Sequence, residues 1–275
     1  MDWSAAGGGI QRLRAWFAGA AYGRHRHDTY AVGITDAGVQ TFWYRGTVHR
    51  SVPGDVIVLH PDEVHDGYAG TSQGFGYRIL YVEPHLVAEA MRCIAAWGPA
   101  LPFLREPVVQ SRALRAVVES AFSNDAGSLA TEDLALALAE GLCAEASIAT
   151  AAVRNVDVAA VKRARDVLEA RPQRMVHSSE LESASGLSRF DLARQFRAYL
   201  GTSPYRYSVM RRLEWARTQL GSRAIADVAA DAGFADQAHF TRAFRGGFGM
   251  TPGRYAGLVK RGVVPASLEA RVPAS

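Results

Sequence analysis

Apolar and polar positions alternate along the first 83 residues, and the pattern then changes to a helical period. Short alternating stretches separated by Gly and Pro favour a small barrel or jelly roll. Asp36-Ala37-Gly38 separates two of these stretches, which predicts a hairpin loop whose glycine adopts positive φ. On one strand Trp43 lies on the face opposite Phe42 and Tyr44, and alternation alone does not decide which face lines the interior. The predicted strands are 30–35, 39–44, 55–59 and 77–82.

Three helices are predicted between residues 84 and 150, opening at Glu83-Pro84, at Pro107 and at Thr131. The second and third present an apolar face at helical spacing. Such helices can cover the barrel or pair with a second copy of the chain, and the residues leave both alternatives open. The apolar stripe of the third helix consists of Leu134, Leu138 and Leu142.

The stretch 225–255 has the pattern of two short helices joined by a sharp turn. Gly233 stands where the chain must turn between closely crossing helices, and only a residue without Cβ turns there at no steric cost. Phe240 and Phe244, four residues apart, form the buried stripe of the second helix. The opposite face is left free to touch a partner, which is typical of a helix-turn-helix.

The same pattern occurs 48 residues earlier, where 194–207 lies over 242–255 with seven identical positions. A 14-residue motif that occurs twice predicts two tandem helix-turn-helix units. The stretch 205–220 between them has helical spacing and is interpreted as one connecting helix. The two copies differ at the position four residues before the turn glycine, where the first has the charged Glu182 and the second has the small Ala229.

Charge divides the chain into two halves. Residues 1–156 hold 12 Lys and Arg against 16 Asp and Glu, whereas residues 157–261 hold 18 against 10. A basic C-terminal half indicates a polyanionic partner that the acidic N-terminal half does not share. No apolar run approaches the ~18 residues of a membrane span and no signal-peptide pattern is present, so we expect a cytoplasmic protein without a membrane partner. Cys93 and Cys143 are interpreted as reduced thiols.

Residues 157–260 resemble the AraC/XylS family of bacterial transcription regulators, most specifically at 225–255. The resemblance implies binding to double-stranded DNA, action together with RNA polymerase, and a homodimer formed through the third helix. By the matching positions, Arg194 and Arg242 would face bases, with phosphate binding as the alternative, whereas Arg197 and Arg245 would bind phosphate or form internal ion pairs. Ala193 and Ala238 could at most touch a thymine methyl. The predicted DNA-binding residues are Arg189, Phe190, Asp191, Arg194, Arg197, Gln237, Ala238, Thr241, Arg242 and Arg245.

Residues 10–83 resemble the cupin-type sensor domain of the same family, through His25-Arg-His27 and the stretch 53–65. The cupin metal set includes a Glu that this sequence lacks, so His25, His27 and His65 are predicted to line an effector pocket without metal or other cofactor. Arginines near the predicted pocket (Arg24, Arg26 and Arg78) would favour an acidic effector, or else be solvated surface charges. His60 is interpreted as structural. The predicted effector-binding residues are His25, His27, Tyr30, Trp43, His65, Tyr77 and Arg78.

The sequence therefore predicts an α+β protein in two domains. Residues 1–150 form a cupin-like β-barrel with a helical dimerisation segment, 151–156 a linker, 157–261 an all-α domain with two helix-turn-helix units joined by a long helix, and 262–275 a flexible tail. The predicted function is a sequence-specific transcription regulator that responds to a small-molecule effector, and no enzymatic activity is expected. The alternatives are a metal-dependent cupin enzyme tethered to DNA and an architectural DNA binder without an effector.

Overall fold

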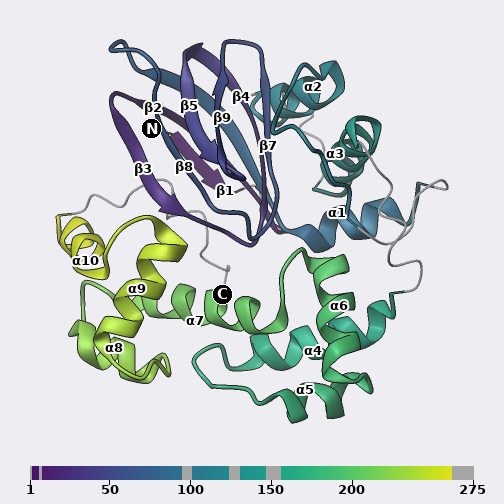
Figure 1. Cartoon of the computed structure of the whole chain (residues 1–275), viewed down its shortest axis with the longest axis vertical. Coiled ribbons are helices and arrows are strands. Elements are labelled where there is room, and N and C mark those ends of the chain that lie inside the picture. Colours follow the sequence, from purple (N-terminus) through teal and green to yellow (C-terminus); the bar gives the residue numbers. More distant parts are fainter. Residues whose placement is uncertain (1, 6–7, 95–100, 124–130, 147–155, 262–275) are drawn as a thin grey trace.

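A computed structural model of the 275-residue chain describes residues 2–5, 8–94, 101–123, 131–146 and 156–261 (Figure 1). The strands form one body, and the helices of the C-terminal half form a second body that lies against one end of it. Residues 151–155 of the predicted linker and the predicted tail 262–275 lie outside the described residues.

Two antiparallel sheets face each other in the N-terminal domain. The six-stranded sheet has the order β1-β2-β9-β4-β7-β10, and the four-stranded sheet has the order β3-β8-β5-β6. The strands are β1 (Asp2–Ala5), β2 (Ile10–Phe17), β3 (Ala20–His25), β4 (Tyr30–Gly38), β5 (Gln40–Tyr44), β6 (Thr47–Ser51), β7 (Val56–Leu59), β8 (His65–Ala69), β9 (Phe75–Val82) and β10 (Val108–Val109).

The hairpin predicted around Asp36-Ala37-Gly38 is not formed. β4 pairs with β7 and β9, whereas β5 pairs with β6 and β8, so this loop carries the chain from one sheet to the other. Gly38 does adopt the predicted positive φ, 71°. A Cβ at Gly38 would lie 2.1 Å from the carbonyl oxygen of Gly74, so this crossing requires glycine.

Strand alternation separates two cores. On β9, Tyr77 and Ile79 point between the sheets, whereas Leu80 and Val82 point to the outer face of the larger sheet. That outer face is covered by α1 (Pro84–Met91), α2 (Arg112–Ala121) and α3 (Thr131–Glu145) (Figure 1). The second helix begins later than predicted, because Val108 and Val109 pair with β7 and Ser111 then caps α2.

The leucine stripe of α3 belongs to the core of its own domain. Leu134, Leu138 and Leu142 are at most 1% exposed and lie in one cluster with residues of α1, α2 and the larger sheet. The structure thus decides between the two alternatives for these leucines. A dimer formed through α3 would have to use its other face.

The C-terminal domain contains the two predicted helix-turn-helix units. In the first, α5 and α6 are joined by a turn at Gly186 (φ 74°); in the second, α8 and α9 are joined by a turn at Gly233 (φ 71°). The predicted connecting helix is α7. The bounds are α4 (Val158–Ala170), α5 (Ser178–Ser185), α6 (Arg189–Leu200), α7 (Pro204–Gln219), α8 (Ile225–Asp231), α9 (Gln237–Phe248) and α10 (Pro252–Lys260).

In both units an arginine from the preceding long helix caps the C-terminal end of the first helix of the helix-turn-helix. Arg163 of α4 donates to the carbonyls of Ala184 and Ser185. Arg212 of α7 donates to those of Ala232 and Gly233, one position later relative to the turn glycine. These carbonyls end a helix and have no intrahelical donor, so each guanidinium satisfies them.

Glu182, the residue that departs from the repeat, is used at the turn. Its carboxylate accepts a hydrogen bond of 2.8 Å from the backbone N–H of Arg189, at the start of α6. An acidic group is favourable there because the first N–H groups of a helix lack backbone acceptors. At the matching position of the second unit, Ala229 is 1% exposed and packs in the core.

Candidate DNA interface and sensor site

The predicted DNA-binding residues lie on corresponding faces of α6 and α9. Nine of the ten are exposed and Thr241 is partly exposed, with Phe190 reaching 77% exposure. Serine and aspartate caps start the two helices, since Ser188 accepts from the N–H of Asp191 and Asp236 from that of His239.

The two faces carry different charge environments. In the first unit Arg194 ion-pairs with Asp191 at 3.0 Å, and this hydrogen bond is the main reason why the pKa of the Asp191 carboxyl is lowered. In the second unit Gln237 takes the position one turn before Thr241 and Arg242. Both faces therefore offer a guanidinium and a nearby carboxylate. Asp191 holds Arg194 in an ion pair, whereas Asp236 caps the backbone of α9.

The three histidines of the predicted effector pocket come together. The ring centroids of His25 and His65 lie 4.4 Å apart, and those of His27 and His65 lie 4.8 Å apart. Each Nδ1 donates to a backbone carbonyl, from His25 to Gly23, from His27 to Thr29 and from His65 to Glu63. Because a carbonyl only accepts, Nδ1 carries the proton in all three, and Nε2 is the atom left for other partners.

Two rings of this cluster, His27 and His65, are buried. Burial lowers the pKa of His65 to about 4, so its ring is neutral near neutral pH. Nε2 of His27 is buried and has no hydrogen-bond partner among the described residues. No group of three or more His, Cys, Asp or Glu in the described part of the chain has an arrangement that could hold a metal ion.

Other predicted pocket residues lie elsewhere, and strand alternation is the reason. Tyr30 and Arg78 occupy positions of β4 and β9 that face outward, where Tyr30 donates to the carbonyl of Pro102 and Arg78 pairs with Asp36 at 2.8 Å. Phe42 and Tyr44 point inward, which places Trp43 on the outside under the guanidinium of Arg24. Arg24 and Arg26 pair with Asp66 and Asp62.

Tyr77 does lie between the sheets, stacked with Phe17 and Phe75. Sequence reasoning missed Tyr22 and Tyr81, whose rings stand edge-on to His25 and His27 at 5.1 and 5.3 Å. The sequence does indicate Tyr81, because it lies four residues after Tyr77 on the same strand and therefore on the same face. Nothing in the sequence indicates Tyr22, because β3 pairs irregularly with β8.

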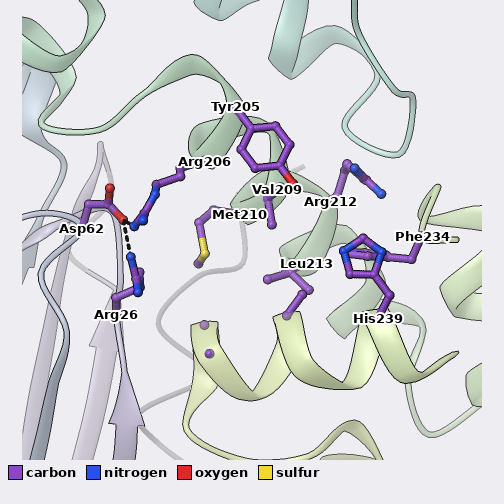
Figure 2. A pocket seen from close by; sticks show the side chains of 13 residues that line it. Arg26, Asp62, Tyr205, Arg206, Val209, Met210, Arg212, Leu213, Phe234 and His239 are labelled. Atoms are coloured by element: carbon purple, nitrogen blue, oxygen red, sulfur yellow. Dashed lines mark hydrogen bonds and ion pairs between the residues drawn. The ribbon is translucent and has the colours of Figure 1, made fainter. Parts of the chain in front are cut away.

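The sensor and DNA-binding domains touch through charged groups. Asp62 of the barrel accepts from Thr202 at 3.1 Å. It also accepts from Arg206 at 2.7 Å and lies 3.6 Å from Arg26 (Figure 2). Asp62, Arg26 and Arg206 line a hollow of about 240 Å³ together with other residues of α7 and α9. Farther along α7, Arg211 pairs with Asp28 of the barrel. The backbone N–H of Arg26 also donates to the carbonyl of Gly246 in α9.

A larger cavity, of about 570 Å³, separates the barrel rim from α6. Arg45 and His60 line it from the barrel, and Phe103 lines it from the segment before β10. The opposite wall is formed by Phe190, Arg194 and Arg197 of α6. His60 is otherwise structural, as predicted. Its Nδ1 contacts the hydroxyl of Tyr44, and its Nε2 accepts from the N–H of Leu104.

Comparison with known proteins gives matches in both domains. A family model described as an AraC-like ligand binding domain matches residues 7–139, and one described as a helix-turn-helix domain matches residues 181–257. YbfI from Bacillus subtilis, an uncharacterised HTH-type transcriptional regulator, is 27% identical over 78% of this chain and 80% of its own. The transcriptional activator NphR from Rhodococcus is 37% identical over 46% of this chain and 37% of its own.

Among solved structures, ToxT from Vibrio cholerae bound to a naphthalenyl butenoic acid superposes with a TM-score of 0.61. The match covers 92% of this chain and 100% of that one, at 11% identity, and shows a shared fold. In the family matches, a ligand-binding domain thus precedes a helix-turn-helix domain. The chain belongs to the AraC family of DNA-binding transcription regulators.

Proposed function

We propose that the chain regulates transcription by placing α6 and α9 in successive major grooves and by adjusting this placement to a small effector held in the barrel. The carrying observation is that two equivalent arginine-bearing faces lie exposed on two copies of one motif, joined by the single helix α7. Successive major grooves on one side of DNA lie ~34 Å apart, and a rigid connecting helix maintains such a spacing.

Base reading is assigned to the outermost polar side chains. Gln237 suits adenine, and Arg194 and Arg242 suit guanine through bidentate hydrogen bonds. Arg197 and Arg245 lie one turn nearer the C-terminal end of each helix and are assigned to phosphate. The salt bridge to Asp191 must open or rotate before Arg194 reaches a base, so the second unit contributes more to direct readout.

The effector site is assigned to the histidine and tyrosine cluster of the barrel. Nε2 of His27 and the neutral ring of His65 can accept hydrogen bonds, and the surrounding rings favour an apolar body. The cluster therefore suits a partly apolar molecule with a hydroxyl, amide or protonated acid. An ionised carboxylate is disfavoured, because Arg24, Arg26 and Arg78 all face away into ion pairs. ToxT, the solved neighbour, is bound to a carboxylic acid with a large apolar part, which supports an apolar effector body.

The cluster is connected to α7 by adjacent residues. His27 precedes Asp28, which pairs with Arg211, and the carbonyl of His27 accepts from the N–H of Asp62, which binds Arg206. An effector that moves His27 thus displaces two contacts of the connecting helix. Such coupling alters DNA affinity only as far as the effector prefers one arrangement of the domains.

The proposal includes partners. A homodimer and RNA polymerase complete the regulatory complex, and the DNA target locates the protein in the cytoplasm. No helix in the described part of the chain is long and apolar enough to cross a membrane. No chemical step is assigned to the protein.

The test uses full-length protein and the DNA sequence that it selects from a random pool. Arg242→Ala is expected to weaken binding to that sequence by about 1–3 kcal/mol and to relax preference at one base position. Arg78→Ala removes the same charge from the sensor domain and should leave both unchanged. Equal weakening on selected and random DNA would make Arg242 a phosphate contact, and the absence of any selected sequence would favour an architectural binder.

A further inference from the structure

Phe190 is the most exposed large apolar side chain in the described part of the chain, at 77%. It is the second residue of α6, the helix that Ser188 caps. A single apolar residue on a surface needs no explanation by itself, but this one stands among the polar residues of the proposed DNA-reading face. It is therefore placed for a contact that forms when that face is covered.

A second apolar side chain lies beside it. Ala193 follows Phe190 by three residues, on the same side of the helix, and is partly exposed. Neither residue belongs to the core of its own unit, and both line the cavity beside the barrel rim. Arg194 comes next, one turn after Phe190, and Asp191 holds its guanidinium at 3.0 Å. The face of α6 thus presents an apolar patch, Phe190 and Ala193, next to one oriented guanidinium.

The internal repeat shows that this patch is particular to the first unit. Shifted by 48 residues, Ala238 and Thr241 of α9 stand where α6 has Phe190 and Ala193. The arginine is the same in both copies. The second unit therefore offers a hydroxyl and no aromatic ring at the positions where the first offers only apolar surface. Two copies of one motif that differ in this way contact different groups on DNA.

The major groove has one apolar group on its base edges, the methyl group on C5 of thymine. Cytosine has hydrogen on that carbon, and 5-methylcytosine carries the same methyl group as thymine. We infer that the apolar patch of α6 reads the 5-methyl group of a pyrimidine, supplied by thymine or by 5-methylcytosine, near a guanine bound by Arg194. The inference rests on the proposed DNA-reading role of α6 and names the group that this helix reads.

Base analogues in the selected DNA sequence test the methyl group alone. The α6 half is the half in which Arg242→Ala leaves base preference unchanged. Replacing one thymine of that half by deoxyuridine removes only a methyl group and should weaken binding about fourfold, as expected for one methyl-sized apolar group. With cytosine at that position, C5 methylation should strengthen binding by a similar factor. Fluorescence anisotropy measures all four DNAs, and the comparison of thymine with 5-methylcytosine identifies the preferred source of the methyl group.

Variants assign the effect to the patch. Phe190→Ala should remove both methyl effects and leave the circular dichroism spectrum unchanged, because the side chain is exposed. Phe190→Leu retains an apolar group and should keep part of each effect. The repeat supplies the reciprocal variant, since Ala238 occupies the equivalent exposed position of α9. Ala238→Phe should create a dependence on a pyrimidine methyl group in the other half of the DNA site.

Three results would overturn the assignment. The α6 half could show no position at which thymine binds more tightly than deoxyuridine, or the methyl effects could survive Phe190→Ala. Phe190→Ala could also weaken binding equally to the thymine and deoxyuridine DNAs, which would make Phe190 a contact to the sugar-phosphate backbone. In each case the protein still selects a DNA sequence. Failure of the proposed function is a different result, in which no sequence is selected.

Discussion

His60 illustrates how one buried side chain joins the barrel, a loop and the cavity beside α6. Its ring is 7% exposed and spans from the Tyr44 hydroxyl to the backbone N–H of Leu104. Because Nε2 accepts from an N–H, a proton on that nitrogen would break the contact. Burial, together with the nearby Arg45 charge, therefore holds the pKa of His60 at about 3.

Stability should fall in mild acid for this reason. The ordinary pKa of 6.5 is depressed in the folded state, so between about pH 6.5 and 3 the unfolded chain binds a proton that the folded chain does not. The loss for this group approaches ~1.4 kcal/mol per pH unit. Gln can make both hydrogen bonds without titrating, so His60→Gln should reduce the stability difference between about pH 6.5 and about pH 5 by roughly 2 kcal/mol. Urea unfolding at the two pH values measures this, and an unchanged difference would mean that His60 is protonated in the folded protein.

Helices in this chain are positioned by the faces that they bury. α3 carries alternating Leu and Ala, and three of its leucines fill the space above the larger sheet. α6 and α9 bury Phe196, Phe240 and Phe244 and leave their arginine-bearing faces outside. The sensor domain therefore loses core packing when α3 is altered, whereas altering the outer faces of α6 and α9 costs little stability.

Leu138 distinguishes a core helix from an interface helix. Leu138→Ala is expected to destabilise the sensor domain by about 2–5 kcal/mol, because the surrounding core cannot fully collapse on the cavity. Leu138→Arg should unfold that domain and not produce a folded monomer. Glu140→Arg, on the exposed side of the same helix, should change stability by less than about 0.5 kcal/mol. Circular dichroism with sedimentation checks all three, and a folded Leu138→Arg monomer would contradict the core assignment.

At the scale of the whole molecule, the two domains are connected by a few charged contacts and one small apolar seam. Ala88 of α1 packs with the first helix-turn-helix unit, and Tyr199 of that unit donates to Glu89. Asp62 adds contacts to Thr202 and Arg206 from a loop residue with φ of 65°, a conformation that Asp and Asn tolerate. In this arrangement the barrel rim borders the α6 face, so it opposes the entry of a DNA duplex.

Weakening the Asp62 contact should consequently favour DNA. Asp62→Asn preserves the loop conformation and removes the charge that holds Arg206. A partly exposed ion pair contributes about 0.5–1 kcal/mol, so DNA affinity without effector should rise about two- to fivefold. Asp36→Asn, which breaks the Arg78 pair on the outer sheet, is the control. Fluorescence anisotropy measures both variants, and tighter binding by neither, or equally by both, would show that Asp62 does not restrain the domains.

Much of this architecture was readable from the chain, because local rules act over short distances. A 48-residue repeat, turn glycines at Gly186 and Gly233, and phenylalanines four residues apart specify helix-turn-helix units without tertiary information. The family match follows from the same residues. Four of the ten described strands, β4, β5, β7 and β9, were also predicted, since alternation and Gly/Pro punctuation depend only on neighbouring residues.

Only the tertiary structure determines which strands pair, which face of each strand points inward, and how the two domains dock. The sequence around Gly38 predicts a tight loop, but only long-range pairing determines that it joins two sheets and not two strands of one. Likewise Trp43 and Arg78 each lie on the strand face opposite to their neighbours in the chain. Which of the two faces points to the interior depends on where the other sheet and the helices pack. The cavity between the barrel rim and α6 could not be predicted, because Arg45 and Arg197 are 152 positions apart and meet only when the domains dock.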